Sequence, residues 1–309
     1  MKFAIFGTGG VGGYFGGRLA QAGQDVTFIA RGKHLEAMKT NGLQVDSING
    51  SFKLNPVQVA ESLSSLKNVD VIILSTKAWQ LTSAIEQIKA LADSRLLILP
   101  LLNGMGHMDI LHAEFGDRVL GGLCRISSFL VEPARVSHVA VNPMIAFNEW
   151  KSTGSARVKN LQGVFLKAQG LSVEVPADIE LAMWEKYLLI CAFSGVGAVT
   201  RQPIGVFRAI PESWALFRRA LEEVMQVANA RGVMLTPDSV QAVIDRMNQT
   251  QADMVTSMQK DIMEGRPSEL EAQTGAVIRM AHAAGLSVPV HEFIYASLLP
   301  MERKARGEG

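Results

Sequence analysis

The sequence predicts a doubly wound α/β domain followed by an all-helical C-terminal domain. Two observations carry this prediction. Apolar strand-like runs alternate with helical stretches over the first half, and long helical patterns without strand signals follow Pro176. The length of 309 residues agrees with about two domains, since a typical domain holds roughly 150 residues. We therefore expect one domain over residues 1–176 and a helical domain over residues 177–309.

The elements of the first half follow from short apolar runs bounded by glycine. The first run stops at Gly7, as a strand buried on both faces of a parallel sheet does, and Gly23 closes the helical stretch after it. The strands expected in this half are residues 2–6, 25–30, 69–75 and 96–101. The expected helices are residues 14–22 and 81–91. This alternation predicts a doubly wound sheet.

The second half has helical periodicity, with proline and glycine at the ends of its segments. The expected helices are residues 179–196, 212–230, 237–258 and 268–284. From Glu302 onward we expect only a polar tail. Six methionines of this half fit core packing better than a homodimer face, although both interpretations stay open. They are Met225, Met234, Met247, Met254, Met258 and Met263.

Composition argues against several classes of protein. Thirty Lys and Arg against 29 Asp and Glu give a net charge of +1, which indicates no basic surface for nucleic acid. Cys124 and Cys191 have no metal-ligand spacing and favour a reduced chain. The apolar stretches are shorter than the roughly 18 residues of a membrane span, and none resembles a signal peptide. We expect a cytoplasmic protein with no nucleic-acid or membrane partner.

A glycine motif lies between the first strand and the first helix. It is Gly7-Thr8-Gly9-Gly10-Val11-Gly12. Gly7 permits the tight turn, Gly9 lets the backbone approach a pyrophosphate, and Gly12 lets helix and strand pack closely. The helix N-terminus supplies free N–H groups for the phosphates. The motif predicts a Rossmann-type dinucleotide-binding domain, whereas a glycine-rich turn without a ligand is the alternative.

The residue after the second strand indicates which dinucleotide binds. A carboxylate there would accept hydrogen bonds from the ribose 2′-hydroxyl, whereas a cation favours a 2′-phosphate. This chain has Arg31, followed by Lys33. Arginine can bind a phosphate through two hydrogen bonds. We therefore favour NADP (NADPH) over NAD, with a solvated basic loop as the alternative.

A nicotinamide enzyme needs a proton donor, and the sequence offers one lysine for that role. No Tyr-x-x-x-Lys pair occurs, and the six histidines show no metal-ligand pairing, so no metal site is expected. Lys186 enters one of the most apolar helices of the chain, after Trp184. Because burial favours the neutral form of a lysine, Lys186 is a candidate acid at neutral pH.

These features and several others resemble the ketopantoate reductase family (2-dehydropantoate 2-reductases), along nearly the whole chain. The similar segments are the glycine motif through Arg31, Ser75-Thr76-Lys77-Ala78, Leu102-Asn103-Gly104-Met105-Gly106, Trp184 to Lys186, and Ser257 with Glu269 and Gly275. Leu102 stands where the family usually has glutamine.

The resemblance implies NADPH-dependent reduction of a small 2-oxoacid. Lys186 would give a proton to the alkoxide, Asn103 would hold the nicotinamide ribose and orient Lys186, and Lys77 would lie on the cofactor side. Ser257 would bind the substrate carboxylate, and Glu269 would bond to cofactor or reacting groups. From the residues alone, Glu269 also fits a helix start, Asn103 a turn, and Ser257 and Lys77 a surface position.

The chain departs from the pantoate-forming enzymes at three positions. Where they place asparagines for the substrate hydroxyl, this chain has Ile190, Ser194 and Ile204. Of the three, only Ser194 could still contact a polar substrate group. The two isoleucines would leave a buried substrate hydroxyl unsatisfied, which costs about 1–3 kcal/mol. A 2-oxoacid with a bulkier apolar tail is therefore an alternative to ketopantoate. The sequence is also compatible with a β-hydroxyacid dehydrogenase or with a non-catalytic NADP sensor.

Overall fold

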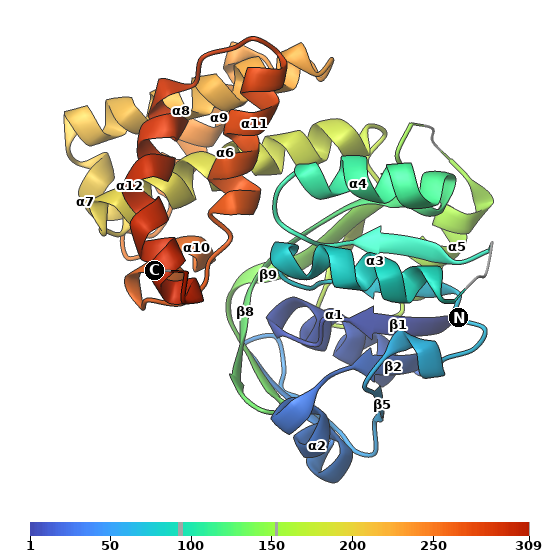
Figure 1. The fold of residues 1–309 in the computed structure, drawn as a ribbon. Coiled ribbons are helices and arrows are strands. Elements are labelled where there is room, and N and C mark those ends of the chain that lie inside the picture. The colour runs from blue at the N-terminus through green and yellow to red at the C-terminus, as the bar shows by residue number, and fades with distance from the viewer. Residues whose placement is uncertain (92–94, 152–153, 309) are drawn as a thin grey trace. The chain divides into compact units, whose positions relative to one another are not determined.

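The computed structural model describes residues 1–91, 95–151 and 154–308. It divides into two compact units (Figure 1). The first comprises Met1–Leu102 and His107–Ile179. The second comprises Asn103–Gly106 and Glu180–Gly309, so the segment after the last strand of the first sheet groups with the helical unit.

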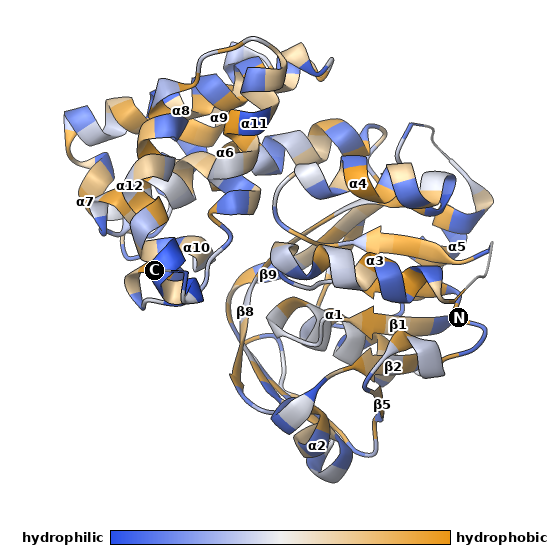
Figure 2. Cartoon of the chain, in the orientation of Figure 1, coloured by the Kyte–Doolittle hydropathy of each residue, from blue (hydrophilic) through white to orange (hydrophobic). Residues whose placement is uncertain are grey.

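The first unit contains a five-stranded sheet in the order β5-β2-β1-β6-β7. Its strands are β1 (Lys2–Phe6), β2 (Asp25–Ile29), β5 (Gln58–Ala60), β6 (Val71–Leu74) and β7 (Leu97–Pro100). Every pairing is parallel. The order reverses between β1 and β6, which is where doubly wound sheets bind ligands at the strand ends. The apolar colour along β1 in Figure 2 agrees with its burial on both faces. The predicted α/β class with a helical second part is confirmed.

Helices flank this sheet. They are α1 (Gly10–Gln21), α2 (Gly32–Asn41), α3 (Leu81–Lys89), α4 (Gly106–Phe115) and α5 (Ala156–Phe165), with short 3₁₀ turns at η1 (Leu63–Ser65), η2 (Ala78–Gln80) and η3 (Gly116–Arg118). The first helix starts at Gly10, four residues before the predicted start. Half of the glycine motif therefore lies in the first helical turn.

A second sheet, which the sequence patterns did not predict, completes the first unit. Its strands are β3 (Leu43–Ser47), β4 (Phe52–Leu54), β8 (Leu120–Glu132), β9 (Arg135–Glu149) and β10 (Ser172–Glu174). The strands β8 and β9 form a long antiparallel pair with register shifts near Ser127. Those irregularities break the strict alternation on which a strand prediction depends.

The helix α1 lies between the two sheets, and its glycines allow both contacts. A Cβ on Gly16 would lie 2.6 Å from Ile5 of β1, on the side of the parallel sheet. A Cβ on Gly13 would lie 2.7 Å from Val136 of β9, and one on Gly17 would lie 2.9 Å from Phe52 of β4. Side chains at these positions would push the sheets apart, so the small residues of α1 fix the packing of the unit.

The second unit is helical. It contains α6 (Ile179–Thr200), α7 (Ile204–Arg208), α8 (Pro211–Ala230), α9 (Pro237–Gln249), α10 (Ser257–Met263), a π-helical turn η4 (Glu271–Gly275), α11 (Ala276–Ala283) and α12 (Pro289–Arg306). The helix α6 is long and apolar enough to cross a membrane by length and composition, but 67% of its most apolar window is buried in the fold. The expectation that no stretch reaches that length was therefore wrong, although the burial is that of a core helix.

Three expectations for this unit need correction. The stretch 237–258 forms two helices, because Thr256 caps a new helix with its hydroxyl on the Gln259 N–H. The stretch 268–284 becomes helical only at Glu271, and it begins with a π turn. The expected polar tail is the last turn of α12, in which Glu302 is buried.

Candidate active site

The glycine loop connects β1 to α1 in a conformation that glycine permits. Gly7 has a φ of 106°, and a Cβ there would lie 2.6 Å from the Ser75 backbone at the end of β6. The Ser75 hydroxyl donates to the Gly7 carbonyl at 2.9 Å. A Cβ on Gly12 would lie 2.8 Å from Ile5. Gly7 and Gly12 therefore bring the helix N-terminus close to the strand ends.

Gly9 differs from these glycines because space surrounds it. No described atom lies within 4 Å of the position that a Cβ on Gly9 would take. Gly9 is also the N-cap of α1, and its lack of a side chain leaves the first helical amides uncapped. Open space in front of free N–H groups at a helix start fits the pyrophosphate of a dinucleotide. Val11, in the first turn, is half-buried.

Two side chains that the sequence did not single out for this purpose anchor the loop. The Thr8 hydroxyl donates to the Ile29 carbonyl at the end of β2, at 2.9 Å. His34 of α2 lies beside the Thr8 backbone, and its Nδ1 accepts from the Ala134 N–H at 3.0 Å. Burial lowers the pKa of His34 below its ordinary value of 6.5. Thr8 and His34 thus tie the loop to β2 and α2.

The predicted cations of the first unit lie at the ends of its strands. Arg31 is the N-cap of α2, two residues after the end of β2, and both Arg31 and Lys33 are exposed. Lys77 follows β6 and is half-buried, with its Nζ 5.8 Å from the centre of the Trp79 ring. The ends of parallel strands meet at one edge of a sheet, so these cations share that edge with the glycine loop.

The second unit brings three of the predicted residues into one hydrogen-bonded chain. Lys186 Nζ donates to Asn103 Oδ1 at 3.0 Å, and Asn103 Nδ2 donates to Glu269 Oε2 at 3.1 Å. Lys186 and Asn103 are half-buried, and Glu269 is 5% exposed. A carboxylate only accepts hydrogen bonds, so Glu269 fixes which end of the Asn103 amide faces Lys186.

The π turn packs against the residues next to Asn103 and Lys186. A Cβ on Gly104, whose φ is 100°, would lie 2.6 Å from the Ala272 carbonyl, so the segment after Asn103 lies against the turn. The Tyr187 hydroxyl donates to the Gln273 carbonyl at 2.7 Å. Burial raises the pKa of Tyr187 well above its usual value, so the phenol stays a donor. Tyr187, next to Lys186, and Gly104, next to Asn103, therefore both contact the π turn that follows Glu269.

The two predicted serines, Ser257 and Ser194, are not hydrogen-bonded to Lys186, Asn103 or Glu269 in the described part of the molecule. Ser257 is the exposed first residue of α10, whereas Ser194 is 2% exposed within α6. Of the positions that depart from the pantoate-forming pattern, Ile190 is half-buried and Ile204 is fully buried. Ile204 therefore packs in the core of the unit.

Family comparison decides what kind of protein this is. Residues 3–152 match the family model described as ketopantoate reductase PanE/ApbA, and residues 178–302 match the model of its C-terminal part. The chain belongs to the ketopantoate reductase family. It is thus a ketopantoate reductase-like oxidoreductase, and its cofactor is a nicotinamide dinucleotide.

The chain matches its relatives over nearly their whole length. The chain is 33% identical to the uncharacterized oxidoreductase YkpB of Bacillus subtilis, covering 96% of this chain and 98% of that protein. It is 27% identical to a 2-dehydropantoate 2-reductase of Pyrococcus horikoshii, covering 99% of both. The crystal structure of a PanE/ApbA family ketopantoate reductase from Ralstonia eutropha superposes with a TM-score of 0.90 at 28% identity, covering 99% of this chain and 100% of the other.

Proposed function

We propose that this protein reduces a 2-oxoacid to a 2-hydroxyacid with NADPH, and that Lys186 is the proton donor. The observation that carries the proposal is the hydrogen-bonded chain from Lys186 through Asn103 to Glu269. It places one ammonium group on a half-buried helix position, oriented by an amide that is itself oriented by a buried carboxylate. Such an oriented acid is what carbonyl reduction requires of a protein.

The roles of the three side chains follow from their donors and acceptors. Asn103 Oδ1 takes one ammonium hydrogen of Lys186, which leaves the others for the substrate carbonyl oxygen. As hydride adds to the carbonyl carbon, Lys186 stabilises the developing alkoxide and donates a proton to it. Glu269 keeps the Asn103 amide in the required orientation.

The first unit supplies the cofactor site in this proposal. Residues Gly7, Thr8, Gly9, Gly10, Val11 and Gly12 would hold the pyrophosphate, and the space around Gly9 with the free amides of α1 supports this role. Arg31 would bind the 2′-phosphate, which favours NADP over NAD, and Lys77 would lie on the cofactor side. When bound, the reduced nicotinamide supplies the hydride.

The substrate pocket is proposed on the second unit. Ser257 and Ser194 are the polar groups assigned to the substrate, with Ser257 on its carboxylate. One candidate substrate is 2-dehydropantoate (ketopantoate), which would be reduced to pantoate in the pantothenate pathway. Ile190 next to Lys186 on α6 favours a 2-oxoacid with a more apolar tail, because an apolar pocket leaves a substrate hydroxyl unsatisfied.

The cellular setting is also part of the proposal. Both cysteines are buried and neither is in a disulfide, which suits a reducing cytoplasm. The methionines of the helical unit divide between core and surface: Met247 and Met258 are buried, whereas Met234 and Met263 are exposed. Met225 and Met254 are half-buried, and the exposed methionines are the ones best placed for a homodimer contact.

The proposal is tested by mixing the purified protein with NADPH or NADH and a panel of 2-oxoacids. The panel holds ketopantoate, branched aliphatic 2-oxoacids and an aryl 2-oxoacid, and the loss of reduced-cofactor absorbance gives kcat and KM. We expect turnover with NADPH in preference to NADH. Preference for ketopantoate would assign the pantothenate reaction, and preference for an apolar acid would assign the alternative. Tight NADPH binding without turnover of any acid would instead identify an NADP sensor.

A further inference from the structure

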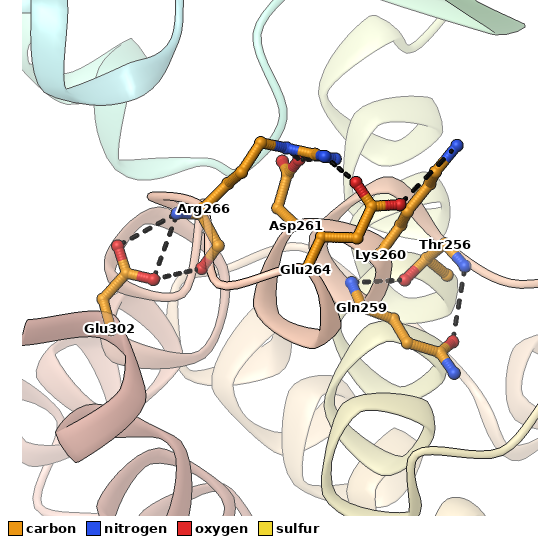
Figure 3. Close-up of polar contacts among 8 residues, drawn as sticks. Thr256, Gln259, Lys260, Asp261, Glu264, Arg266 and Glu302 are labelled. Carbon is orange, nitrogen blue, oxygen red and sulfur yellow. Dashed lines mark hydrogen bonds and ion pairs between the residues drawn. The ribbon is translucent and has the colours of Figure 1, made fainter. Parts of the chain in front are cut away.

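Two side chains of the last helix, α12, form hydrogen bonds with Ser268, the residue before Glu269. Glu302 of α12 is 5% exposed, and its carboxylate accepts from the Ser268 N–H at 3.1 Å to each oxygen. It also accepts from the Ser268 hydroxyl at 2.5 Å. Figure 3 shows Glu302 directed at the segment that follows α10. Ser268 is fully buried.

A second residue of α12 completes the contact. Arg306, one turn after Glu302, donates from Nε to Glu302 Oε1 at 2.7 Å and from Nη2 to the Ser268 carbonyl at 3.0 Å. One pair of side chains therefore binds both the N–H and the carbonyl of Ser268. That carbonyl belongs to the peptide group that joins Ser268 to Glu269, so Arg306 fixes the plane from which the Glu269 side chain starts.

The segment needs such support because it is not helical. The chain leaves α10 at Met263, and the π turn starts only at Glu271. Before Ser268, Arg266 is bound to Asp261 of α10 at 2.8 Å (Figure 3). After it, the Leu270 N–H donates to the Ser268 hydroxyl at 3.2 Å. Ser268 is thus the point at which this irregular segment is fixed to the helical core.

We propose that Glu302, together with Arg306, is a positioning residue for Glu269. The inference rests on the proposed function, in which Glu269 orients Asn103 and Lys186. A buried carboxylate is costly unless it is paired and hydrogen-bonded, and apolar side chains would pack α12 equally well. Apart from its pairing with Arg306, Glu302 accepts all its hydrogen bonds from Ser268, the residue before Glu269. The pair sets where the Glu269 carboxylate meets Asn103.

The experiment compares Glu302→Gln with a matched control, Glu223→Gln. Glu223 is also a buried carboxylate, 7% exposed, and it accepts from the backbone N–H groups of Val290 and His291 at 2.8 and 3.0 Å. It therefore ties the other end of α12 to the unit by the same kind of bond. Only Glu302 lies beside the Glu269 segment, so a general loss of stability affects both variants and a positioning effect only one.

Two readouts are measured on the full-length protein. Hydrogen exchange followed by mass spectrometry should show at least about fivefold faster exchange over residues 264–275 in E302Q and no change there in E223Q. With the best 2-oxoacid of the panel, kcat should fall about tenfold in E302Q, because small misplacements of catalytic groups are costly. The Kd for NADPH should stay within about twofold, and E223Q should keep its kcat within about twofold.

Further outcomes separate the two proposals. Wild-type turnover with an E302Q kcat that matches E223Q overturns the positioning role and leaves the proposed function intact. A wild-type protein that reduces no 2-oxoacid overturns both. If E302Q does not fold, Arg306→Lys takes its place, since it keeps the charge beside Glu302 but loses the two-pronged contact. It should lower kcat about threefold or more, and an unchanged kcat overturns the inference.

Discussion

The glycine loop of the first unit and the Lys186 cluster of the second unit, the hydrogen-bonded Lys186, Asn103 and Glu269, are built in opposite ways. The loop comes from six consecutive residues, and what matters at Gly7, Gly9 and Gly12 is the absence of a side chain. The cluster joins residues separated by 83 and 166 positions, and what matters is the direction of each polar group. A local motif can thus specify the backbone shape of the proposed cofactor site, whereas the proposed acid depends on the tertiary fold.

The largest expected effect is on the cluster. Lys186→Ala removes the proposed proton donor, and since general acid catalysis contributes roughly 10²–10⁴-fold, kcat should fall at least about 100-fold. The Kd for NADPH, measured by its fluorescence, should change little, because the loop lies in the other unit. The matched control is Lys304→Ala, an exposed lysine of the helical unit, which should retain full activity. A folded K186A enzyme that turns over at a near wild-type rate would contradict the assignment.

A smaller effect is expected from adding one methyl group to the loop. Gly12→Ala places a Cβ 2.8 Å from Ile5 and against the Gly7 carbonyl, and overpacking of this kind costs roughly 1–3 kcal/mol. Gly9→Ala meets no described atom within 4 Å, and its φ of −92° suits alanine. We therefore expect G12A to lower the midpoint of thermal unfolding and G9A to preserve it.

The same pair of variants distinguishes packing from binding. In G9A the new methyl group occupies the space proposed for the pyrophosphate, so the Kd for NADPH should rise about tenfold in a protein of wild-type stability. If G9A binds NADPH as tightly as the wild type, the phosphates do not lie against Gly9. If G12A is as stable as G9A, the close approach of α1 to β1 does not limit the packing.

The contrast between the regions also explains what the sequence could predict. Four strands of the parallel sheet and the glycine loop follow from local patterns and have nearly the predicted bounds, whereas the short edge strand β5 was not predicted. Lys186 was proposed as a lysine in an apolar helix, its link to Asn103 came only from a family resemblance, and the bond between Asn103 and Glu269 was not predicted, because no local pattern encodes contacts between distant segments. The structure now supplies that link.

Two errors have the same physical origin. The strands β8 and β9 pair through shifted register, so their residues alternate too irregularly to read as strands. Glu302 lies among charged residues at the end of the chain, a composition typical of a solvated tail, but Ser268, 34 positions away, supplies donors that permit its burial. In both places contacts that a local pattern does not encode, an irregular hairpin for β8 and β9 and a distant serine for Glu302, override the local preference.

The smallest expected effect concerns pH, and it should appear only in the first unit. Burial lowers the pKa of His34, so the unfolded chain binds a proton more readily than the native one. The stability that neutral His34 contributes is therefore present above its ordinary pKa of 6.5 and is lost as the pH falls through the lowered native value. Protonation of Nδ1 would also remove the hydrogen bond that this nitrogen accepts from the Ala134 N–H.

His34→Gln removes this titration, and urea unfolding between pH 5 and pH 8 should then depend less on pH. Hydrogen exchange in peptides of β1 and α1 reports on the first unit, and peptides of α6 and α8 serve as the internal control. Some dependence should remain, because burial also lowers the pKa of His112 in the same unit.

An unchanged pH dependence in H34Q would mean that His34 does not fix the loop in its neutral form. A change in the α6 peptides would mean that the loop and the Lys186 cluster are not as independent as their construction implies.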